Sequence, residues 1–191
     1  KFFANLGVDS IQAARAAGAK EILDAAKGMG MFWPVADDET IPGDQHVLFE
    51  AGKFNDTPVL IGTNSDEGAM FVRPGATPES FEKQVRENYG PAAEAILKVY
   101  PHSTNAEAFE SSRDVFRETT FAWHTWAWAR LQTRKGKNKA FVYYFDHRTQ
   151  GSPNGATHGS EIAYVFGNLG GWGFTPTPDD LAMSERMQSY W

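Results

Sequence analysis

One short stretch limits what this chain can fold into, residues 57–71, which read TPVLIGTNSDEGAMF. An apolar run at residues 59–61 ends at Gly62 and is followed by a polar turn that contains Glu67. Apolar residues without alternation predict a strand buried on both faces, as in a parallel sheet. Because chemistry in open α/β sheets collects beyond the carboxyl ends of such strands, Glu67 is a candidate catalytic carboxylate.

A second strand is predicted at residues 139–145, KAFVYYF, which are rich in aromatic and β-branched side chains. The chain then enters a glycine-rich polar loop that carries His158. Since strand ends can be neighbours in a sheet, Glu67 and His158 form a candidate acid–histidine pair, in which the carboxylate fixes the imidazole tautomer. Spacing alone is a weak signal, because carboxylates in turns are usually solvated and histidines in loops usually have no catalytic role. His147, at the strand end, competes as the base.

Several helices are predicted in the remaining sequence, and residues 29–45 and 168–178 are predicted as loops. Ser10 is suited to cap one helix that Gly18 interrupts, and Thr77 with Pro78 opens another. Asn105 is predicted to cap a long helix over residues 106–133. Its tryptophans at 123, 126 and 128 favour burial on several sides over a ligand platform. A last helix starts at Pro178 and is expected to be unfinished at the chain end, so the element order fits an α/β layered fold.

Composition excludes several classes of function. A net charge of −6 without a long basic run argues against nucleic-acid binding. The sequence contains no run of 18 apolar residues, so no membrane span is predicted. The absence of cysteine excludes disulfides, thiolate nucleophiles and cysteine-ligated metals, while secreted, periplasmic and cytoplasmic locations stay open. The histidines show no metal-ligand spacing, so no metal is predicted.

The local sequence around the pair is more specific than its spacing. The stretches GTNSDEG at 62–68 and HGSEIAYVFGN at 158–168 closely resemble two signature stretches of the type-B carboxylesterases, the cholinesterase-like α/β-hydrolases. The stretch KAFVYYFDH and the terminal SERMQSYW resemble the same family in the same order. The resemblance covers nearly the whole chain and implies an α/β-hydrolase fold, with a parallel-type sheet flanked by helices.

The resemblance also assigns roles. It implies that Glu67 is the acid and His158 the base of a serine esterase triad, which hydrolyses small-molecule carboxylic esters through an acyl-enzyme without a cofactor. Structural supports of this site are expected at motif-adjacent positions, namely Ser65, Asp66, Asp114 and Glu161. Aromatic side chains are expected to line an apolar or aromatic acyl-group pocket, namely Phe32, Trp33, Phe71, Trp172 and Phe174. For Phe32 and Trp33, burial under a loop is an equally good interpretation.

The main departure from the family is the missing nucleophile. No G-x-S-x-G occurs in the 191 residues, and the glycines of an oxyanion hole are missing too. Lys1 therefore looks internal, and residues 1–191 are expected to be the C-terminal portion of a single α/β-hydrolase catalytic domain, incomplete and inactive without its N-terminal portion. The alternatives are a catalytically inactive, cholinesterase-like adhesion or interaction module and a stand-alone α/β binding domain.

Overall fold

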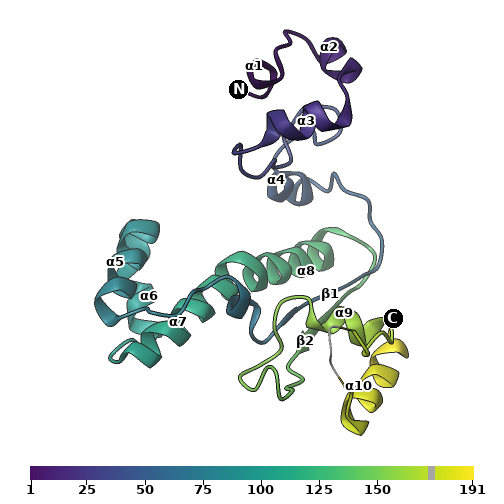
Figure 1. Cartoon of the computed structure of the whole chain (residues 1–191). Helices are drawn as coiled ribbons and strands as arrows, with labels where there is room; N and C mark the ends of the chain where they lie inside the picture. Colours follow the sequence, from purple (N-terminus) through teal and green to yellow (C-terminus); the bar gives the residue numbers. More distant parts are fainter. Residues whose placement is uncertain (172–174) are drawn as a thin grey trace. The chain divides into compact units, whose positions relative to one another are not determined.

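The computed structural model describes residues 1–171 and 175–191. The chain divides into two compact units, Lys1–Val47 and Leu48–Trp191, and the boundary falls within helix α4 (Gln45–Glu50). Figure 1 labels the elements, and each unit is described by itself.

The N-terminal unit contains three short helices, α1 (Phe2–Leu6), α2 (Ile11–Ala16) and α3 (Ala19–Ala26). The predicted cap and break are both confirmed. The Ser10 hydroxyl accepts a hydrogen bond from the Ala13 N–H at 3.2 Å. At Gly18 one helix has ended and the next begins, because extended backbone there cannot continue the helical hydrogen bonds.

The second unit contains two strands, β1 (Val59–Asn64) and β2 (Ala140–Phe145), which pair in parallel (Figure 1). Both predicted strands are therefore confirmed. The register runs from Val59 opposite Ala140 to Asn64 opposite Phe145, so both strands end at the same edge. The strands approach so closely that a Cβ on Gly62 would lie 2.4 Å from the carbonyl oxygen of Tyr143. The segments after the two strands therefore begin side by side.

The prediction that the first strand is buried on both faces is wrong for this chain. Leu60 is 36% exposed and Phe141 on the paired strand is 54% exposed, whereas Asn64 at the strand end is fully buried. A two-stranded sheet has too few neighbouring elements to cover both faces, and α8 (Trp123–Lys135) packs along it. Burial is concentrated at the edge from which the polar turn emerges.

A helical layer precedes the second strand, built from α5 (Pro78–Tyr89), the 3₁₀ turn η2 (Gly90–Ala92), α6 (Ala93–Val99) and α7 (Asn105–Arg117). Thr77 caps α5 as predicted, with Ser80 completing a reciprocal capping box. The cap of α7 is Thr104, one residue before the predicted Asn105, because the Thr104 hydroxyl accepts from the Glu107 N–H at 3.2 Å. The core of this layer comprises Phe81, Val85, Ala93, Ala108 and Val115.

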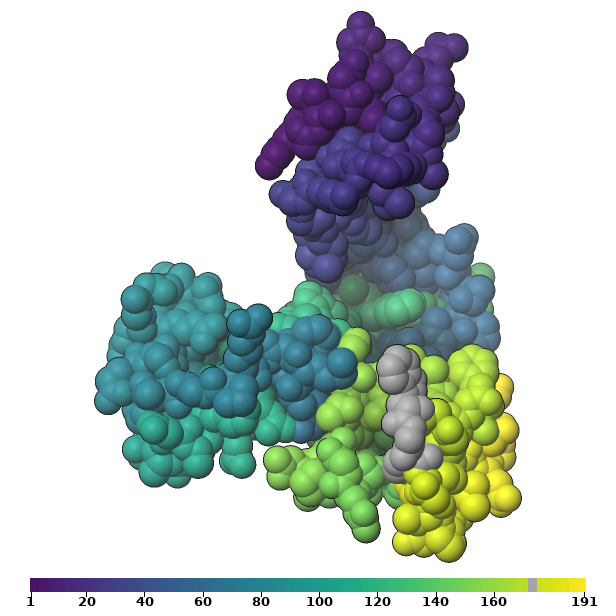
Figure 2. All heavy atoms as spheres, in the orientation of Figure 1, coloured from purple at the N-terminus to yellow at the C-terminus, as the bar shows by residue number. Residues whose placement is uncertain are grey.

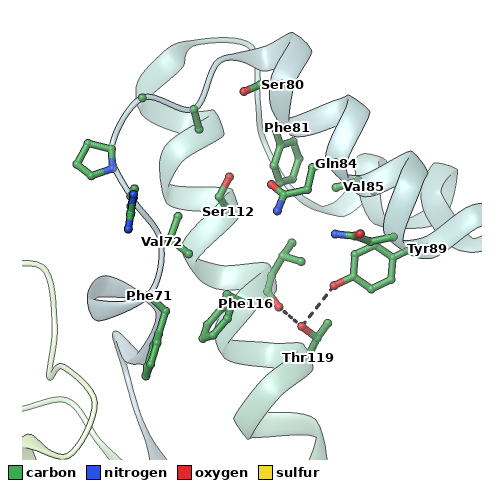
Figure 3. A pocket seen from close by; sticks show the side chains of 16 residues that line it. Phe71, Val72, Ser80, Phe81, Gln84, Val85, Tyr89, Ser112, Phe116 and Thr119 are labelled. Atoms are coloured by element: carbon green, nitrogen blue, oxygen red, sulfur yellow. Dashed lines mark hydrogen bonds between the residues drawn. The ribbon is translucent and has the colours of Figure 1, made fainter. Parts of the chain in front are cut away.

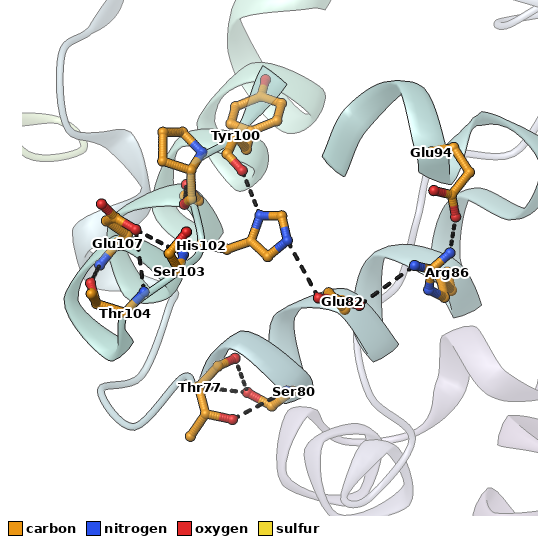
Figure 4. A network of polar contacts seen from close by, with 12 residues as sticks. Thr77, Ser80, Glu82, Arg86, Glu94, Tyr100, His102, Ser103, Thr104 and Glu107 are labelled. Atoms are coloured by element: carbon orange, nitrogen blue, oxygen red, sulfur yellow. Dashed lines mark hydrogen bonds and ion pairs between the residues drawn. The ribbon is translucent and has the colours of Figure 1, made fainter. Parts of the chain in front are cut away.

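Polar contacts on the surface tie α5 to the segment between α6 and α7 (Figure 4). The His102 ring lies 2.7 Å from the Tyr100 carbonyl oxygen through Nδ1 and 3.5 Å from Glu82 through Nε2. Arg86 contacts both Glu82 and Glu94. Because Glu82, Arg86 and Glu94 are exposed, each ion pair of Arg86 contributes about 0–1 kcal/mol of stability.

The predicted long helix is interrupted by a π-helical turn, η3 (Glu118–Ala122), which joins α7 to α8. The expected burial of the tryptophans is wrong: Trp123, Trp126 and Trp128 are 59%, 48% and 42% exposed. Trp126 instead holds the Arg130 guanidinium over its ring at 4.6 Å. No described helix is both long and apolar enough to cross a membrane.

The C-terminal part contains α9 (Ser160–Val165) and α10 (Pro178–Gln188), which pack against each other (Figure 2). Their core includes Phe145, Ala156, Tyr164, Leu169 and Met187. The last helix is not cut off by the chain end, contrary to the expectation, because it ends at Gln188.

Candidate functional site

The structure brings Glu67 and His158 into direct contact although 91 residues separate them. The His158 Nδ1 lies 2.6 Å from Glu67 Oε2, and the Glu67 side chain is 7% exposed while that of His158 is 43% exposed. A contact this short with a carboxylate requires the proton on Nδ1. The second ring nitrogen, Nε2, is therefore the one left for proton transfer.

The other carboxylate oxygen of Glu67 is held by its own turn. The Asn64 N–H donates to Glu67 Oε1 at 2.7 Å, which closes the turn at the end of β1. Glu67 begins the 3₁₀ turn η1 (Glu67–Met70), so its backbone leaves the strand direction at once. Each carboxylate oxygen thus has one donor, and this fixes the orientation of the carboxylate plane toward His158.

The Glu67 turn and the His158 loop are joined along their backbones. Asp66 pairs in parallel with Thr157, and its N–H donates to the Ala156 carbonyl at 2.8 Å. The Ala156 N–H donates in turn to the Ser65 hydroxyl at 2.8 Å. Gly155 permits this approach, since a Cβ there would lie 2.6 Å from the Ser65 hydroxyl oxygen.

Supporting contacts come from α9 and α7. The Asn64 side-chain amide donates to Glu161 and, at 2.8 Å, to the Thr157 carbonyl. Asp114 pairs with Arg117 at 2.8 Å. Ser65, Asp66 and Glu161 therefore contact the end of β1 or the histidine loop directly, whereas Asp114 contacts Arg117, which donates to the Ser65 carbonyl. Burial, and then the negative charges of Glu161 and Glu67, raise the pKa of Tyr143 above its usual value.

Two arginines of α7 also contact the turn, and no motif in the sequence points to them. Arg113 forms a two-pronged ion pair with Asp66, and Arg117 donates to the Ser65 carbonyl at 2.9 Å. The available signal is their spacing of four residues, which places both on one face of a helix.

Three phenylalanines form a wall beside His158. The ring centroids of Phe71 and Phe121 lie 5.3 Å and 4.8 Å from that of the imidazole, and Phe116 stacks on Phe71 at 5.0 Å. Of these, Phe71 was expected and the other two were not. Phe121 lies in the π-helical turn, so a helical wheel of period 3.6 does not predict its direction.

Behind this wall is a cavity of about 530 Å³, bordered by Phe71 and Phe116 (Figure 3). Figure 3 shows Phe81 and Tyr89 of α5 on one side and Phe116 of α7 on the other. The Tyr89 hydroxyl donates to Thr119 at 3.4 Å. The volume lies in the range of small-molecule sites, and the lining is divided about equally between apolar and polar side chains.

The other expected pocket residues do not belong to the described part of the second unit. Phe32 and Trp33 belong to the N-terminal unit, where both are exposed and Phe32 contacts Phe2 edge to face at 6.3 Å. The interpretation of both as buried core aromatics is therefore wrong. Trp172 and Phe174 lie outside the described residues.

The competing histidine has a different partner. The His147 Nε2 lies 2.7 Å from Asp180, the buried carboxylate that also accepts from Tyr164 at 2.7 Å and from Thr177. Burial alone would raise the pKa of Asp180, but the hydrogen bonds from Thr177, Tyr164 and His147 hold it well below its usual value. Within residues 1–171 and 175–191, no group of three or more His, Asp or Glu side chains is arranged to hold a metal ion.

Comparison with known families gives an independent assignment. The model of the carboxylesterase family matches residues 5–191. Among curated proteins, the chain is 26% identical to neuroligin-2 of Rattus norvegicus over 224 residues, with 96% of this chain and 26% of that protein covered. Neuroligin-3 of Homo sapiens is 28% identical over 225 residues, with the same two shares. The chain thus spans about a quarter of the length of these relatives.

Solved structures give the same fold. A PNB esterase matches with a TM-score of 0.78 and 27% identity, over 100% of this chain and 42% of the esterase chain. EstA of Aspergillus niger matches in fold with a TM-score of 0.68 and 21% identity, over 93% of this chain and 39% of that chain. The chain belongs to the carboxylesterase family and has the fold of a portion of an α/β-hydrolase.

Proposed function

We propose that this chain supplies the acid and the histidine of a serine carboxylesterase that hydrolyses carboxylic esters through an acyl-enzyme. The observation that carries the proposal is the 2.6 Å contact between His158 Nδ1 and a buried Glu67 carboxylate whose other oxygen is also held. A half-exposed imidazole oriented in this way is the arrangement that general-base activation of a hydroxyl needs.

In the proposed reaction, His158 Nε2 removes the proton from a serine hydroxyl as the serine oxygen attacks the ester carbonyl. The proton then passes from Nε2 to the departing alcohol, and the acyl group remains on the serine. Water repeats the sequence and releases the carboxylic acid, the free serine and neutral His158. Glu67 stays ionised throughout, holds Nδ1–H and stabilises the imidazolium.

The nucleophile and the oxyanion donors are proposed to come from the N-terminal portion of the same hydrolase domain, of which residues 1–191 are the C-terminal portion. Two observations support this: no G-x-S-x-G occurs in these residues, and the chain covers 42% of the PNB esterase chain. We call this chain together with that N-terminal portion the full-length protein.

The proposed substrate is a small-molecule ester with an apolar or aromatic acyl group. The Phe71, Phe116 and Phe121 wall lies against His158, and the cavity of about 530 Å³ opens behind two of these rings. Apolar groups of a substrate bind such surfaces by removing apolar area from water.

A second candidate is a catalytically inactive interaction module of the same family. It is supported by the relatives named neuroligin, whose names state no enzymatic activity. Retention of a hydrogen-bonded Glu67 and His158 favours the esterase, because an interaction surface does not require a buried acid oriented toward a histidine.

The two candidates are separated by ester hydrolysis in the full-length protein. The esterase proposal expects turnover of a chromogenic phenyl ester, with a loss of at least about 10³-fold in kcat for His158→Ala. His124→Ala is the matched control, since His124 is an exposed histidine of α8. No turnover by a folded full-length protein would favour the interaction module, and equal rates for the His158 variant and the wild type would contradict the role proposed for His158.

A further inference from the structure

Helix α7 contacts the chain on both sides of Glu67 through one residue, Arg113. The Arg113 Nε donates to Asp66 Oδ1 at 3.0 Å, and its terminal Nη2 contacts the other carboxylate oxygen. The two side chains are 13% and 10% exposed. A planar guanidinium that contacts both oxygens of a carboxylate fixes the relative orientation of the two side chains as well as the distance between them.

The residue after Glu67 is fixed by the backbone of the same arginine. Gly68 lies so close to α7 that a Cβ would come within 2.5 Å of the Arg113 carbonyl oxygen and 2.8 Å of its Cα. Asp66 immediately before Glu67 and Gly68 immediately after it are therefore both held against Arg113. The Glu67 backbone has little freedom to shift unless α7 shifts with it.

Asp66 also joins α7 to the loop of the histidine. Its side chain contacts Arg113, while its backbone N–H donates to Ala156, two residues before His158. One helical turn after Arg113, Arg117 donates to the Ser65 carbonyl at 2.9 Å. The acid and the histidine thus share one anchor, and that anchor is attached to α7.

We propose that Arg113 is a positioning residue that sets the separation and orientation of Glu67 and His158. The inference rests on the proposed esterase function. A purely stabilising role explains the geometry less well, because well-packed apolar side chains stabilise a buried site as well as an ion pair does. A two-pronged contact also fixes the orientation of Asp66, and thereby that of the neighbouring Glu67. This matters because small displacements of catalytic groups reduce reaction rates strongly.

The test compares Arg113→Lys with Arg134→Lys in the full-length protein. Lysine keeps the charge but removes the fork, and Arg134 is an exposed arginine that pairs with Glu50 at 2.5 Å. For Arg113→Lys we expect kcat to fall by about 10-fold or more, with KM changed by less than about 3-fold. We expect the low-field proton NMR signal of the His158 Nδ1–H to weaken or shift as well. Arg134→Lys should leave kcat, KM and the His158 Nδ1–H signal unchanged.

The second readout separates this inference from the proposed function, because the Nδ1 proton is observed whether or not the protein turns over an ester. An unchanged signal and unchanged kcat in Arg113→Lys would overturn the positioning role. Absence of ester hydrolysis in the wild type would overturn the esterase proposal, and the NMR comparison alone would then decide the role of Arg113. If Arg113→Lys does not fold, Asp66→Asn tests the same contact with a smaller change, and the same two results decide it.

Discussion

Asn64 and Glu67 form a closed turn in which the backbone N–H of the first donates to one carboxylate oxygen of the second at 2.7 Å. This bond leaves the other oxygen, Oε2, directed at His158 Nδ1. The geometry is produced by the abrupt change from β1 to a 3₁₀ turn. The local turn therefore holds one carboxylate oxygen of Glu67, while Arg113 of α7 contacts the neighbouring Asp66.

Replacing Glu67 with glutamine should reduce kcat for ester hydrolysis by about 10⁴-fold in the full-length protein. Glutamine keeps the shape but loses the charge that stabilises the imidazolium, and an amide N–H donated to Nδ1 places the ring proton on Nε2, where it blocks general-base action. Steady-state kinetics on a chromogenic ester measures the loss, with Glu185→Gln as a control at an exposed glutamate of α10. A loss below about 10-fold would contradict the assigned role of Glu67.

Replacing Gly68 with alanine should destabilise the protein by about 1–3 kcal/mol, because the added Cβ meets the Arg113 backbone, which cannot rotate away. The free energy of urea unfolding of the full-length protein measures this cost. Gly170→Ala is the matched control, since a Cβ there meets no atom within 4 Å. Equal unfolding free energies for the two variants would show that the turn is not held tightly against α7.

The stabilising effect of Asp180 should depend on pH. Its pKa is lowered in the folded protein, so the stability it contributes is present above the pKa of an unfolded aspartate, about 3.9, and is lost as the pH falls toward the folded value. Asp180→Asn should therefore be less stable than wild type at pH 7, and the difference should shrink below about pH 4. Thermal unfolding of both proteins at several pH values measures it. A difference that is constant with pH would contradict this account.

Much of the fold and the acid–histidine pair could be predicted from local sequence. The Thr77 cap is specified by neighbouring residues, and the Glu67 turn follows directly from an apolar strand. The contacts of Arg113 could not be predicted, because they depend on where α7 lies against η1. The exposure of Trp123, Trp126 and Trp128 was missed for a similar reason: apolar character gives a preference for burial but does not identify the element that covers a side chain.

The exposed apolar side chains of the sheet lead to a prediction about the chain in isolation. Leu60, Phe141, Val142 and Tyr144 are all exposed. If the N-terminal portion of a hydrolase domain covers them, the isolated 191-residue chain should bind a hydrophobic fluorescent dye and self-associate, and the full-length protein should not. Dye fluorescence and light scattering at matched concentrations make the comparison. A monomeric isolated chain without dye binding would support a stand-alone domain.

The most direct test of the central claim is the intact mass of the full-length protein before and after reaction with a fluorophosphonate ester. The account predicts one phosphonyl adduct, carried by a glycine-framed serine outside residues 1–191, and loss of adduct formation in His158→Ala. Peptide mapping identifies the modified serine. A folded full-length protein that forms no adduct, or forms it equally well without His158, would contradict the claim that Glu67 and His158 activate a serine nucleophile.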